Sequence, residues 1–221
     1  MAEVDFTQRL HSSTKRDYVA RVTESDKAES ATIAKQWGKD YWDGARHHGY
    51  GGYRYDGRWF PVAKKIAEHY KLQPGDRILD VGCGKGFLLH EFTQAVPGVE
   101  VVGIDASQYG IENAKEEVKP FLQVGHAKQL PFPDNSFDFV ISMATLHNLT
   151  LPELFSAVKE IERVGKGNRK YIMLESWRNE SEKANLLYWQ LTCESFHPVK
   201  SWEWIYEQCG YTGDWGFIFF E

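Results

Sequence analysis

The sequence has little cysteine, no excess of basic residues and no long apolar run. Its three cysteines, Cys83, Cys193 and Cys209, form no Cys-x-x-Cys pair and leave one thiol over in any pairing. Such a count disfavours a disulfide framework or a structural zinc site and favours a reducing compartment. We therefore expect a cytoplasmic protein without a metal site.

Basic charge is also scarce. The 221 residues include 26 Lys and Arg against 31 Asp and Glu, for a formal net charge of −5. Proteins that bind nucleic acid phosphates ordinarily carry a basic stripe, which this sequence lacks. No apolar run approaches the roughly 20 residues that cross a bilayer, and the opening MAEVD lacks the apolar stretch of a signal peptide. We expect neither a nucleic acid nor a membrane as a partner.

The middle of the chain, residues 61–175, has the pattern of an α/β domain. Short apolar runs alternate there with longer segments of helical period, which is typical of βαβ units around a parallel sheet. The predicted strands are 78–81, 99–104, 121–124, 137–142 and 170–175, and the predicted helices are 61–70, 87–95, 108–118 and 151–164. In the flanks we expect helices at 27–41, 182–193 and 201–209 and a last strand at 217–220. This pattern predicts a mostly parallel sheet with helices on both faces.

A predicted strand, a glycine-rich turn and a helix follow one another at residues 78–89. The alternating Gly82, Gly84 and Gly86 let the backbone approach a ligand and place amides at a helix N-terminus, where an anion is favoured. Asp80 precedes this turn and suits a cationic group, and Asp105 ends the next strand and suits a ribose diol.

A ligand that carries a carboxylate, an ammonium group and a ribose points to S-adenosylmethionine. A dinucleotide is disfavoured because the pattern GxGxxG would need a glycine at position 87, where Phe87 stands.

Three segments together resemble the class I S-adenosylmethionine-dependent methyltransferases: LDVGCGKG (79–86), VVGIDAS (101–107) and GHAKQLPFPDNSFDFVISMATLHNL (125–149). The resemblance covers about residues 61–175 and is to the small-molecule type related to quinone C-methyltransferases. The flanking YGGYRYDGRW and NLLYWQLTCESFHP are similar to methyltransferases of surface-polysaccharide biosynthesis. Sheets of this class usually end with two strands after the last helix, but little chain follows Gly210, so we expect a six-stranded or truncated sheet.

The resemblance implies roles in a cofactor site. Asp80 would hold the amino group of S-adenosylmethionine, directly or through water, and the three glycines of the turn would cradle its methionine end. Asp105 would accept from both ribose hydroxyls, and Ala106 would pack on the adenine. Met143, just past the fourth strand, would meet the methionyl part.

The adenine contact departs from the family pattern. The relatives usually have an aspartate before the alanine of the third motif, where it binds the adenine amine, but this chain has His126 before Ala127. His126 could accept from the amine, or a backbone amide could serve instead.

Catalysis by such an enzyme depends mainly on aligning the acceptor, the methyl group and the sulfur, so a base is optional unless the acceptor is a hydroxyl. His147, just beyond the fourth strand, is the first candidate base; alternatively it only starts the next helix. His197, in the aromatic C-terminal block, is the second. Glu175, at the end of the fifth strand, could orient either histidine or the acceptor, or be a surface carboxylate.

The flanks carry all eight tryptophans, and aromatic residues are 14% of the chain. We expect residues 1–60 to form a helical or lid extension and residues 61–221 the methyltransferase domain, with acceptor-site elements in 176–210. Tyr50, Tyr53 and Tyr55 lie in a glycine-rich loop that could be a mobile lid contacting the acceptor or a static packed loop. Flank aromatics could stack on an acceptor, and core packing is the competing explanation.

The resulting hypothesis is methyl transfer to an oxygen of a small polar acceptor: a sugar, a sugar phosphate or a nucleotide-linked intermediate. Amine acceptors are disfavoured because 142–145 reads SMAT instead of the Asn/Asp-Pro-Pro-Tyr/Phe signature. The alternatives are N- or C-methylation of another small metabolite, a non-catalytic cofactor-fold module, and a nucleotide-sugar oxidoreductase. The oligomeric state is left open.

Overall fold

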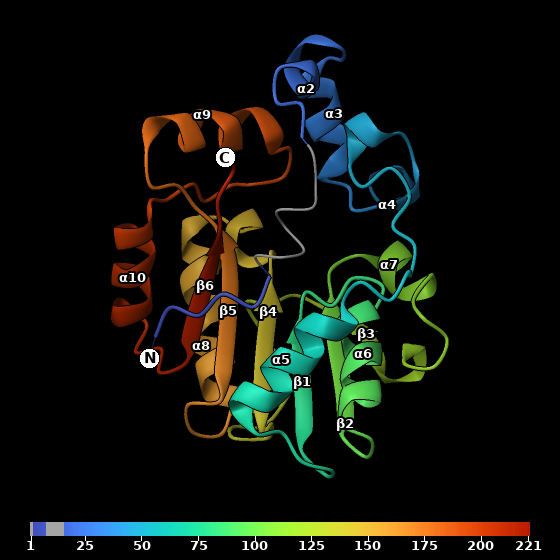
Figure 1. Ribbon diagram of the computed structural model, residues 1–221, viewed down its shortest axis with the longest axis vertical. Coiled ribbons are helices and arrows are strands. Elements are labelled where there is room, and N and C mark those ends of the chain that lie inside the picture. Colours follow the sequence, from blue (N-terminus) through green and yellow to red (C-terminus); the bar gives the residue numbers. More distant parts are fainter. Residues whose placement is uncertain (1, 8–15) are drawn as a thin grey trace.

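A six-stranded parallel sheet forms the centre of the computed structural model, which describes residues 2–7 and 16–221 (Figure 1). The strands are β1 (Arg77–Val81), β2 (Glu100–Asp105), β3 (Leu122–Val124), β4 (Phe139–Met143), β5 (Lys170–Glu175) and β6 (Asp214–Ile218). Their order is β3-β2-β1-β4-β5-β6, and each neighbouring pair is parallel. The predicted α/β class is confirmed, including a sheet of six strands.

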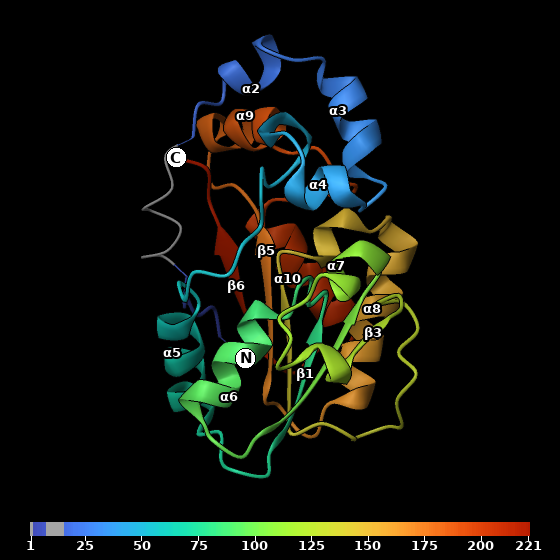
Figure 2. The same ribbon diagram turned by 90° about the vertical axis from the view of Figure 1, so that its right-hand side faces the viewer.

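Helices cover both faces of the sheet (Figures 1 and 2). On one face lie α5 (Phe60–Tyr70) and α6 (Phe87–Ala95), and on the other lie α8 (Leu151–Val164) and α10 (Val199–Gln208). Successive strand residues point to opposite faces, so in β1 Ile78 packs with α5 and α6 while Leu79 packs with α8 and α10. Both layers therefore bury apolar side chains against a sheet that is buried on both sides.

A cap of short helices lies beyond the carboxyl ends of the strands (Figures 1 and 2). It consists of α2 (Ala20–Thr23), α3 (Lys27–Ala34), α4 (Lys39–Asp43), the 3-10 turn η1 (Arg46–His48) and α9 (Glu180–Trp189). The N-terminal and C-terminal parts of the cap are linked, because Lys27 Nζ donates to the Tyr188 carbonyl at 3.0 Å and Lys35 pairs with Glu194. Two flanks that are distant in sequence thus cover the same end of the sheet.

Two predicted helices are shorter in the structure. The helix expected at 27–41 is divided into α3 and α4, because Trp37 has a left-handed φ of 52° and the extended Gly38 is the N-cap of α4. The helix expected at 108–118 ends early as α7 (Gln108–Glu112). After it, the Lys115 N–H donates to the Lys85 carbonyl at 2.9 Å, so a tertiary contact replaces the helical bond.

Other predicted boundaries move by a few residues. The helix expected at 182–193 is α9, which ends at Trp189, and the one expected at 201–209 is α10. The last strand is 214–218 rather than 217–220, because pairing with β5 sets its register from Tyr171 opposite Asp214. The short turns η2 (Lys119–Phe121) and η3 (Leu146–Asn148) complete the described elements.

Residues near the N-terminus cover the edge of the sheet beside β6. The Val4 N–H donates to the Trp215 carbonyl at 2.7 Å, and the Trp215 N–H donates to the Ala2 carbonyl at 3.1 Å. Phe6 then packs edge to face on the buried Tyr171, with ring centroids 4.9 Å apart. An exposed strand edge is a site for unwanted pairing, and this short segment occupies part of it.

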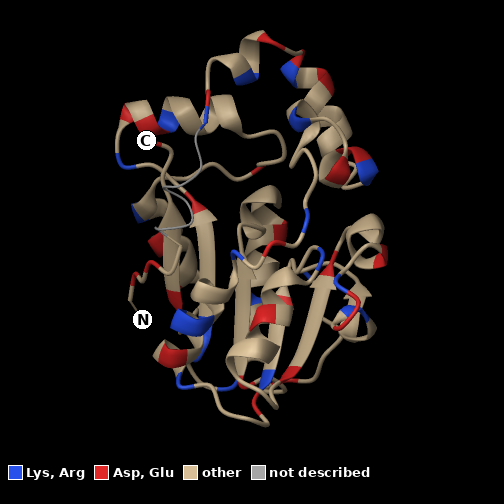
Figure 3. Cartoon of the chain, turned by 45° about the vertical axis from the view of Figure 1, so that its right-hand side comes forward, with Lys and Arg blue, Asp and Glu red and all other residues tan. Residues whose placement is uncertain are grey.

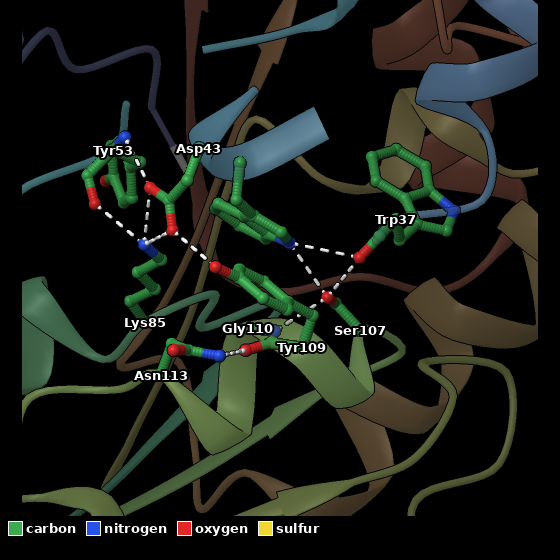
Figure 4. A network of polar contacts seen from close by, with 9 residues as sticks. Trp37, Asp43, Tyr53, Lys85, Ser107, Tyr109, Gly110 and Asn113 are labelled. Carbon is green, nitrogen blue, oxygen red and sulfur yellow. Dashed lines mark hydrogen bonds and ion pairs between the residues drawn. The ribbon is translucent and has the colours of Figure 1, made fainter. Parts of the chain in front are cut away.

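A buried ion pair attaches the cap to the glycine turn (Figure 4). Lys85, between Gly84 and Gly86, is only 5% exposed, and its Nζ donates to the two Asp43 carboxylate oxygens at 2.8 and 2.7 Å. The Tyr109 hydroxyl donates to the same carboxylate at 2.9 Å. Burial raises the pKa of Asp43, but the hydrogen bonds from Lys85 and Tyr109 outweigh it and lower the pKa below its usual value. Asp43 is therefore ionised at neutral pH.

Replacing Asp43 by alanine leaves the Lys85 ammonium buried without its carboxylate. We expect the free energy of unfolding to fall by about 3 kcal/mol, which is the scale for removing one partner of a buried pair. The control is Asp56→Ala, which breaks the exposed pair with Arg58 and should cost less than about 1 kcal/mol. Urea denaturation followed by tryptophan fluorescence measures both changes, and similar losses in the two variants would contradict this assignment.

Candidate functional site

Two cavities adjoin at the carboxyl ends of the strands. The small cavity has a volume of about 180 Å³ and the large cavity about 440 Å³. Tyr41, Tyr50, Ala144 and Asn148 line both. The cavities therefore meet at these four residues.

The small cavity collects most of the residues predicted to bind a cofactor. These are Gly82, Asp105, Ala106, His126, Ala127 and Met143. They come from the turn after β1, the end of β2, the loop after β3 and the end of β4. The cap contributes Trp37 and Tyr41 to the same walls. The predicted residues Asp80, Gly84 and Gly86 do not line either cavity.

Asp105 is held in place by backbone amides. Its Oδ2 accepts from the Gly84 N–H at 2.8 Å and its Oδ1 accepts from the Ser107 N–H at 2.7 Å. A carboxylate oxygen has two lone pairs, so each oxygen keeps acceptor capacity for a ligand. Burial raises the pKa of Asp105, while these two amides lower it. The group is a pre-positioned acceptor for two hydroxyls, as a ribose diol requires.

Asp80 is a buried carboxyl with an unsatisfied oxygen. It is 3% exposed, and its Oδ1 has no hydrogen-bond partner in the described chain. Burial, with the nearby Asp105 as the second cause, raises the pKa of Asp80 to about 8. At neutral pH the free protein thus holds this group mainly in its neutral form. A ligand ammonium would supply both the missing partner and a compensating charge.

The glycine turn is closely covered. Gly82 has a φ of 90°, and a Cβ there would overlap the Thr145 side chain. Gly84 has a φ of 53°, and a Cβ there would lie 2.8 Å from Cη2 of Trp42. Any side chain at these two positions would displace its neighbours, so the close approach depends on glycine.

His126 is in a position to donate rather than accept. Its Nδ1 accepts from the Lys128 N–H at 3.3 Å, which in a neutral ring leaves the proton on Nε2. Burial, followed by the charge of Lys128, lowers the pKa of His126, so the ring is neutral at pH 7. A neutral ring in this tautomer offers a donor at Nε2 and no free acceptor. Of the two alternatives that the sequence left open, this tautomer is less suited to accepting from the adenine amine, and the adenine contact stays a prediction.

Glu175 and His147 lie side by side in the wall of the large cavity. His147 Nε2 is 3.7 Å from Glu175 Oε2, and the Gln190 side-chain amide donates to the same oxygen. Burial raises the pKa of Glu175 to about 7, although the Gln190 bond and the charge of Arg16 oppose this. Burial lowers the pKa of His147 to about 3, so its ring is neutral. Glu175 is therefore the group that can exchange a proton near neutral pH.

The three tyrosines predicted to contact a substrate all line the large cavity. Tyr50 stacks on Trp42 with ring centroids 5.3 Å apart, and Tyr53 stacks on Phe87 at 4.9 Å. Tyr55 lies edge to face on the same Phe87 at 5.7 Å. Each ring thus packs on one side while it forms part of the cavity wall. Whether the loop moves as a lid stays a prediction.

His197, the second predicted base, lies outside both cavities. Its ring packs edge to face on the buried Trp202, with centroids 4.9 Å apart. The structure does not bring it together with Glu175 and His147 in the cavity wall.

The sequence analysis missed several residues that line the large cavity. The most prominent are five arginines: Arg16, Arg21, Arg46, Arg54 and Arg58. Figure 3 shows basic and acidic residues interspersed over the chain, so these arginines stand out by position rather than by number. Their irregular spacing forms no motif. The one available signal is that they all precede residue 60 in a chain that is acidic overall.

The described residues contain neither a cluster of metal ligands nor a membrane-spanning helix. Within residues 2–7 and 16–221, no three His, Cys, Asp or Glu side chains gather as a metal ion would require. In the same residues no helix has the length and apolar character needed to cross a membrane.

Residues 79–173 match the family described as Methyltransferase domain. The chain is 34% identical over 158 residues to a demethylmenaquinone methyltransferase of Symbiobacterium thermophilum, an alignment that covers 66% of this chain and 60% of the relative. It is 36% identical over 118 residues to a demethylmenaquinone methyltransferase of Staphylococcus aureus, covering 51% and 48%. The chain thus spans about half to three fifths of the length of these relatives.

Solved structures show the same fold. The YcgJ protein of Bacillus subtilis has a TM-score of 0.56 at 23% identity, with 70% of this chain and 68% of that chain covered. An S-adenosylmethionine-dependent methyltransferase of Methanosarcina mazei has a TM-score of 0.52 at 25% identity, with 65% and 82% covered.

Residues 79–173 therefore match the methyltransferase-domain family, and the sheet has the class I methyltransferase fold that the sequence motifs predict. The cofactor that this match and fold imply is S-adenosylmethionine. The residues present fit that group, because Asp80 has an unsatisfied buried oxygen and Asp105 keeps acceptor capacity at the small cavity. The individual roles of these residues stay predictions.

We predict that Asp80→Asn alters cofactor binding and its pH dependence together. In the wild type, binding an ammonium group requires Asp80 to lose its proton, so affinity for S-adenosylhomocysteine should rise between pH 5.5 and 7.5. In Asp80→Asn the affinity should be at least about tenfold weaker and nearly independent of pH, since no proton is released. Calorimetry in buffers of different ionisation enthalpy measures both the affinity and the proton release.

The stability of the free protein provides the control. A carboxyl whose pKa is raised on folding destabilises the folded state as the pH rises above its unfolded value, so removing it should not lower stability at high pH. Free Asp80→Asn should melt at or above the wild-type temperature at pH 8.5. A lower melting temperature together with unchanged pH dependence of binding would show that Asp80 has only a structural role.

Proposed function

We propose that this chain transfers the methyl group of S-adenosylmethionine to an oxygen of a small polar acceptor bound in the large cavity. The observation that carries the proposal is the junction of the two cavities. Asp105 lines the small cavity, Glu175 and His147 line the large one, and Ala144 belongs to both. A donor and an acceptor placed on either side of this junction would meet there.

When bound, the cofactor supplies an electrophilic methyl group on a sulfonium. The protein's task is to orient the acceptor and remove its proton. Glu175, with a pKa near 7, is ionised in about half of the molecules at neutral pH and can take a proton from an acceptor hydroxyl. Gln190 donates to its Oε2 and so fixes the side-chain orientation. His147, which is neutral, stays beside the carboxylate without adding a competing charge.

The cap would provide the acceptor specificity. In this proposal residues 1–60 form the helical and tyrosine-containing cover, and residues 61–221 form the methyltransferase domain. Elements in 176–210 complete the acceptor site. The support is that Tyr50 and Tyr53 of the first segment and Gln190 of the last line one cavity. The arginines and tyrosines that line that cavity favour a sugar, a sugar phosphate or a nucleotide-linked acceptor.

A second function is C-methylation of a quinone ring. It is favoured by the 34% identity to demethylmenaquinone methyltransferase, which by its name acts on demethylmenaquinone. Carbon methylation also needs a base to remove a ring or hydroxyl proton, and Glu175 would serve there too. The arginine-lined wall of the large cavity is a poor match for a strongly apolar acceptor, so we rank this function second.

The test is a methyl-transfer assay with labelled S-adenosylmethionine and four acceptors: a free hexose, a hexose phosphate, a nucleotide sugar and demethylmenaquinone. We expect labelled product from one of the three sugar compounds and none from the quinone. Transfer to the quinone alone would replace the first function by the second. Failure to bind S-adenosylhomocysteine in calorimetry would contradict both.

We predict that Glu175→Gln lowers kcat by about 100-fold or more, which is the usual contribution of a general base. The wild-type rate should rise with pH through about 7 as the carboxyl ionises, and the variant should lose this rise. Affinity for S-adenosylhomocysteine should be unchanged, because in the proposed function Glu175 contacts the acceptor in the large cavity and no part of the cofactor. The control His69→Gln changes an exposed ring on α5 and should retain the wild-type profile. An intact pH profile in Glu175→Gln would exclude Glu175 as the base.

A further inference from the structure

Three guanidinium groups gather around one indole ring in the wall of the large cavity. The guanidinium carbons of Arg21 and Arg46 each lie 5.0 Å from the centroid of the Trp189 ring, and that of Arg16 lies 5.3 Å from it. Arg21 and Arg46 come from the N-terminal part of the cap, and Trp189 ends α9. The cluster therefore forms only when the two parts of the cap come together.

The charges of Arg21 and Arg46 are not compensated by the protein. In the described chain neither forms an ion pair with a carboxylate. Their hydrogen bonds go to backbone carbonyls: Arg21 donates to Trp189 at 3.3 Å and to Arg46 at 2.7 Å, and Arg46 donates to Gly49 at 2.5 Å. The Nη2 group of each side chain has no acceptor among the described residues.

The lowered pKa of Arg21 shows that its charged form is disfavoured in this arrangement. Burial, followed by the neighbouring charge of Arg46, lowers the pKa of Arg21 to about 10. Arg46 itself is exposed and Arg21 is half-buried, and two cations held close together at a cavity wall attract an anion more strongly than one isolated arginine does. Each guanidinium can also donate a planar pair of N–H groups, which matches the oxygens of a phosphate.

We propose that Arg21 and Arg46 bind a phosphate group of the methyl acceptor, so that the acceptor is a phosphorylated small molecule. This inference rests on the proposed function and makes its substrate class specific. The phosphate lies at the cluster on Trp189, and the reacting hydroxyl lies toward Glu175. The residue after Trp189 is Gln190, which donates to the Glu175 carboxylate, so two consecutive residues contact the arginine cluster and the base.

A phosphate fits this site better than a carboxylate does. A phosphomonoester or diphosphate carries up to two negative charges at pH 7, which balances the two uncompensated guanidinium groups. The cavity of about 440 Å³ also has space for a sugar between the cluster and Glu175. Arg58 is less suited to the role, since it already pairs with Asp56.

The experiment measures two affinities for each protein by calorimetry: that of S-adenosylhomocysteine, and that of pyrophosphate in its presence. The proteins are the wild type, Arg21→Gln, Arg46→Gln, and Lys64→Gln as a charge-matched control on the exposed side of α5. Inorganic phosphate and malonate, titrated at the same ionic strength, compare a phosphate with a dicarboxylate. Arg21→Lys keeps the charge but loses the planar pair of donors, and melting temperatures verify that each variant is folded.

We expect pyrophosphate affinity to fall at least tenfold in Arg21→Gln and Arg46→Gln, partly recover in Arg21→Lys and stay unchanged in Lys64→Gln. Affinity for S-adenosylhomocysteine should be the same in all of them. Two results would overturn the phosphate site while leaving the proposed function intact. In the first, the wild type binds S-adenosylhomocysteine normally but does not bind pyrophosphate. In the second, pyrophosphate affinity is the same in the wild type, Arg21→Gln and Arg46→Gln. Tighter binding of malonate than of phosphate would overturn the phosphorylated class. Loss of S-adenosylhomocysteine binding in the wild type would overturn the proposed function itself.

Discussion

The buried ammonium of Lys85 is the interaction on which the cofactor site and the cap both depend. Lys85 lies within the glycine turn and cannot stay buried without a carboxylate, and Asp43 at the end of α4 supplies it. The adjacent Trp42 lies on Gly84, and its Nε1 donates to the Ser107 hydroxyl at 2.8 Å. The cap is thus anchored on the same turn that approaches the cofactor, so the position of one fixes the position of the other.

This coupling explains the uneven placement of the aromatic residues. Trp42 covers the glycine turn, Trp189 carries the arginine cluster, and Trp202 is buried against α8 and the sheet. Of the two explanations weighed for the flank aromatics, core packing holds for Trp202, while Trp189 lines a cavity, where stacking on an acceptor stays a prediction. The sheet domain between the flanks packs aliphatic side chains such as Leu79 and Ile172 together with phenylalanine and tyrosine rings but no tryptophan.

Local patterns made most of the fold predictable. The apolar runs and the helical periods locate all six strands and both helix layers to within a few residues, because each element buries a face that its own sequence encodes. The errors lie where tertiary contacts override local preference. Trp37 adopts a left-handed φ inside a segment of helical period. Lys115 lies beyond the end of α7, because its N–H donates to the Lys85 carbonyl and not to a carbonyl of the predicted helix.

The site was predictable to the extent that it lies on the sheet. Asp105 and Glu175 are the last residues of β2 and β5, and parallel strands bring their carboxyl ends to one edge, so topology alone places them where open α/β sheets bind ligands. The arginine cluster could not be found in this way. Arg21 and Trp189 are far apart in sequence and belong to no motif, and they meet only because the two parts of the cap pack together. The opposite error occurs at His197. Its position in an aromatic segment indicated a site residue, whereas in the structure its ring packs on Trp202.

The charges of the two cavities are complementary to what each would bind. In the free protein the small cavity lies beside the mainly neutral Asp80, whose pKa is near 8, and the large cavity contains a half-ionised Glu175. A cationic donor would lower the pKa of Asp80 and ionise it, whereas an anionic acceptor at Arg21 and Arg46 would offset the positive charge of the two guanidinium groups. The donor would relieve the cost of the buried Asp80 carboxyl, and the acceptor would relieve the repulsion between Arg21 and Arg46. The two sites would therefore discriminate a cation from an anion without any rearrangement of the sheet.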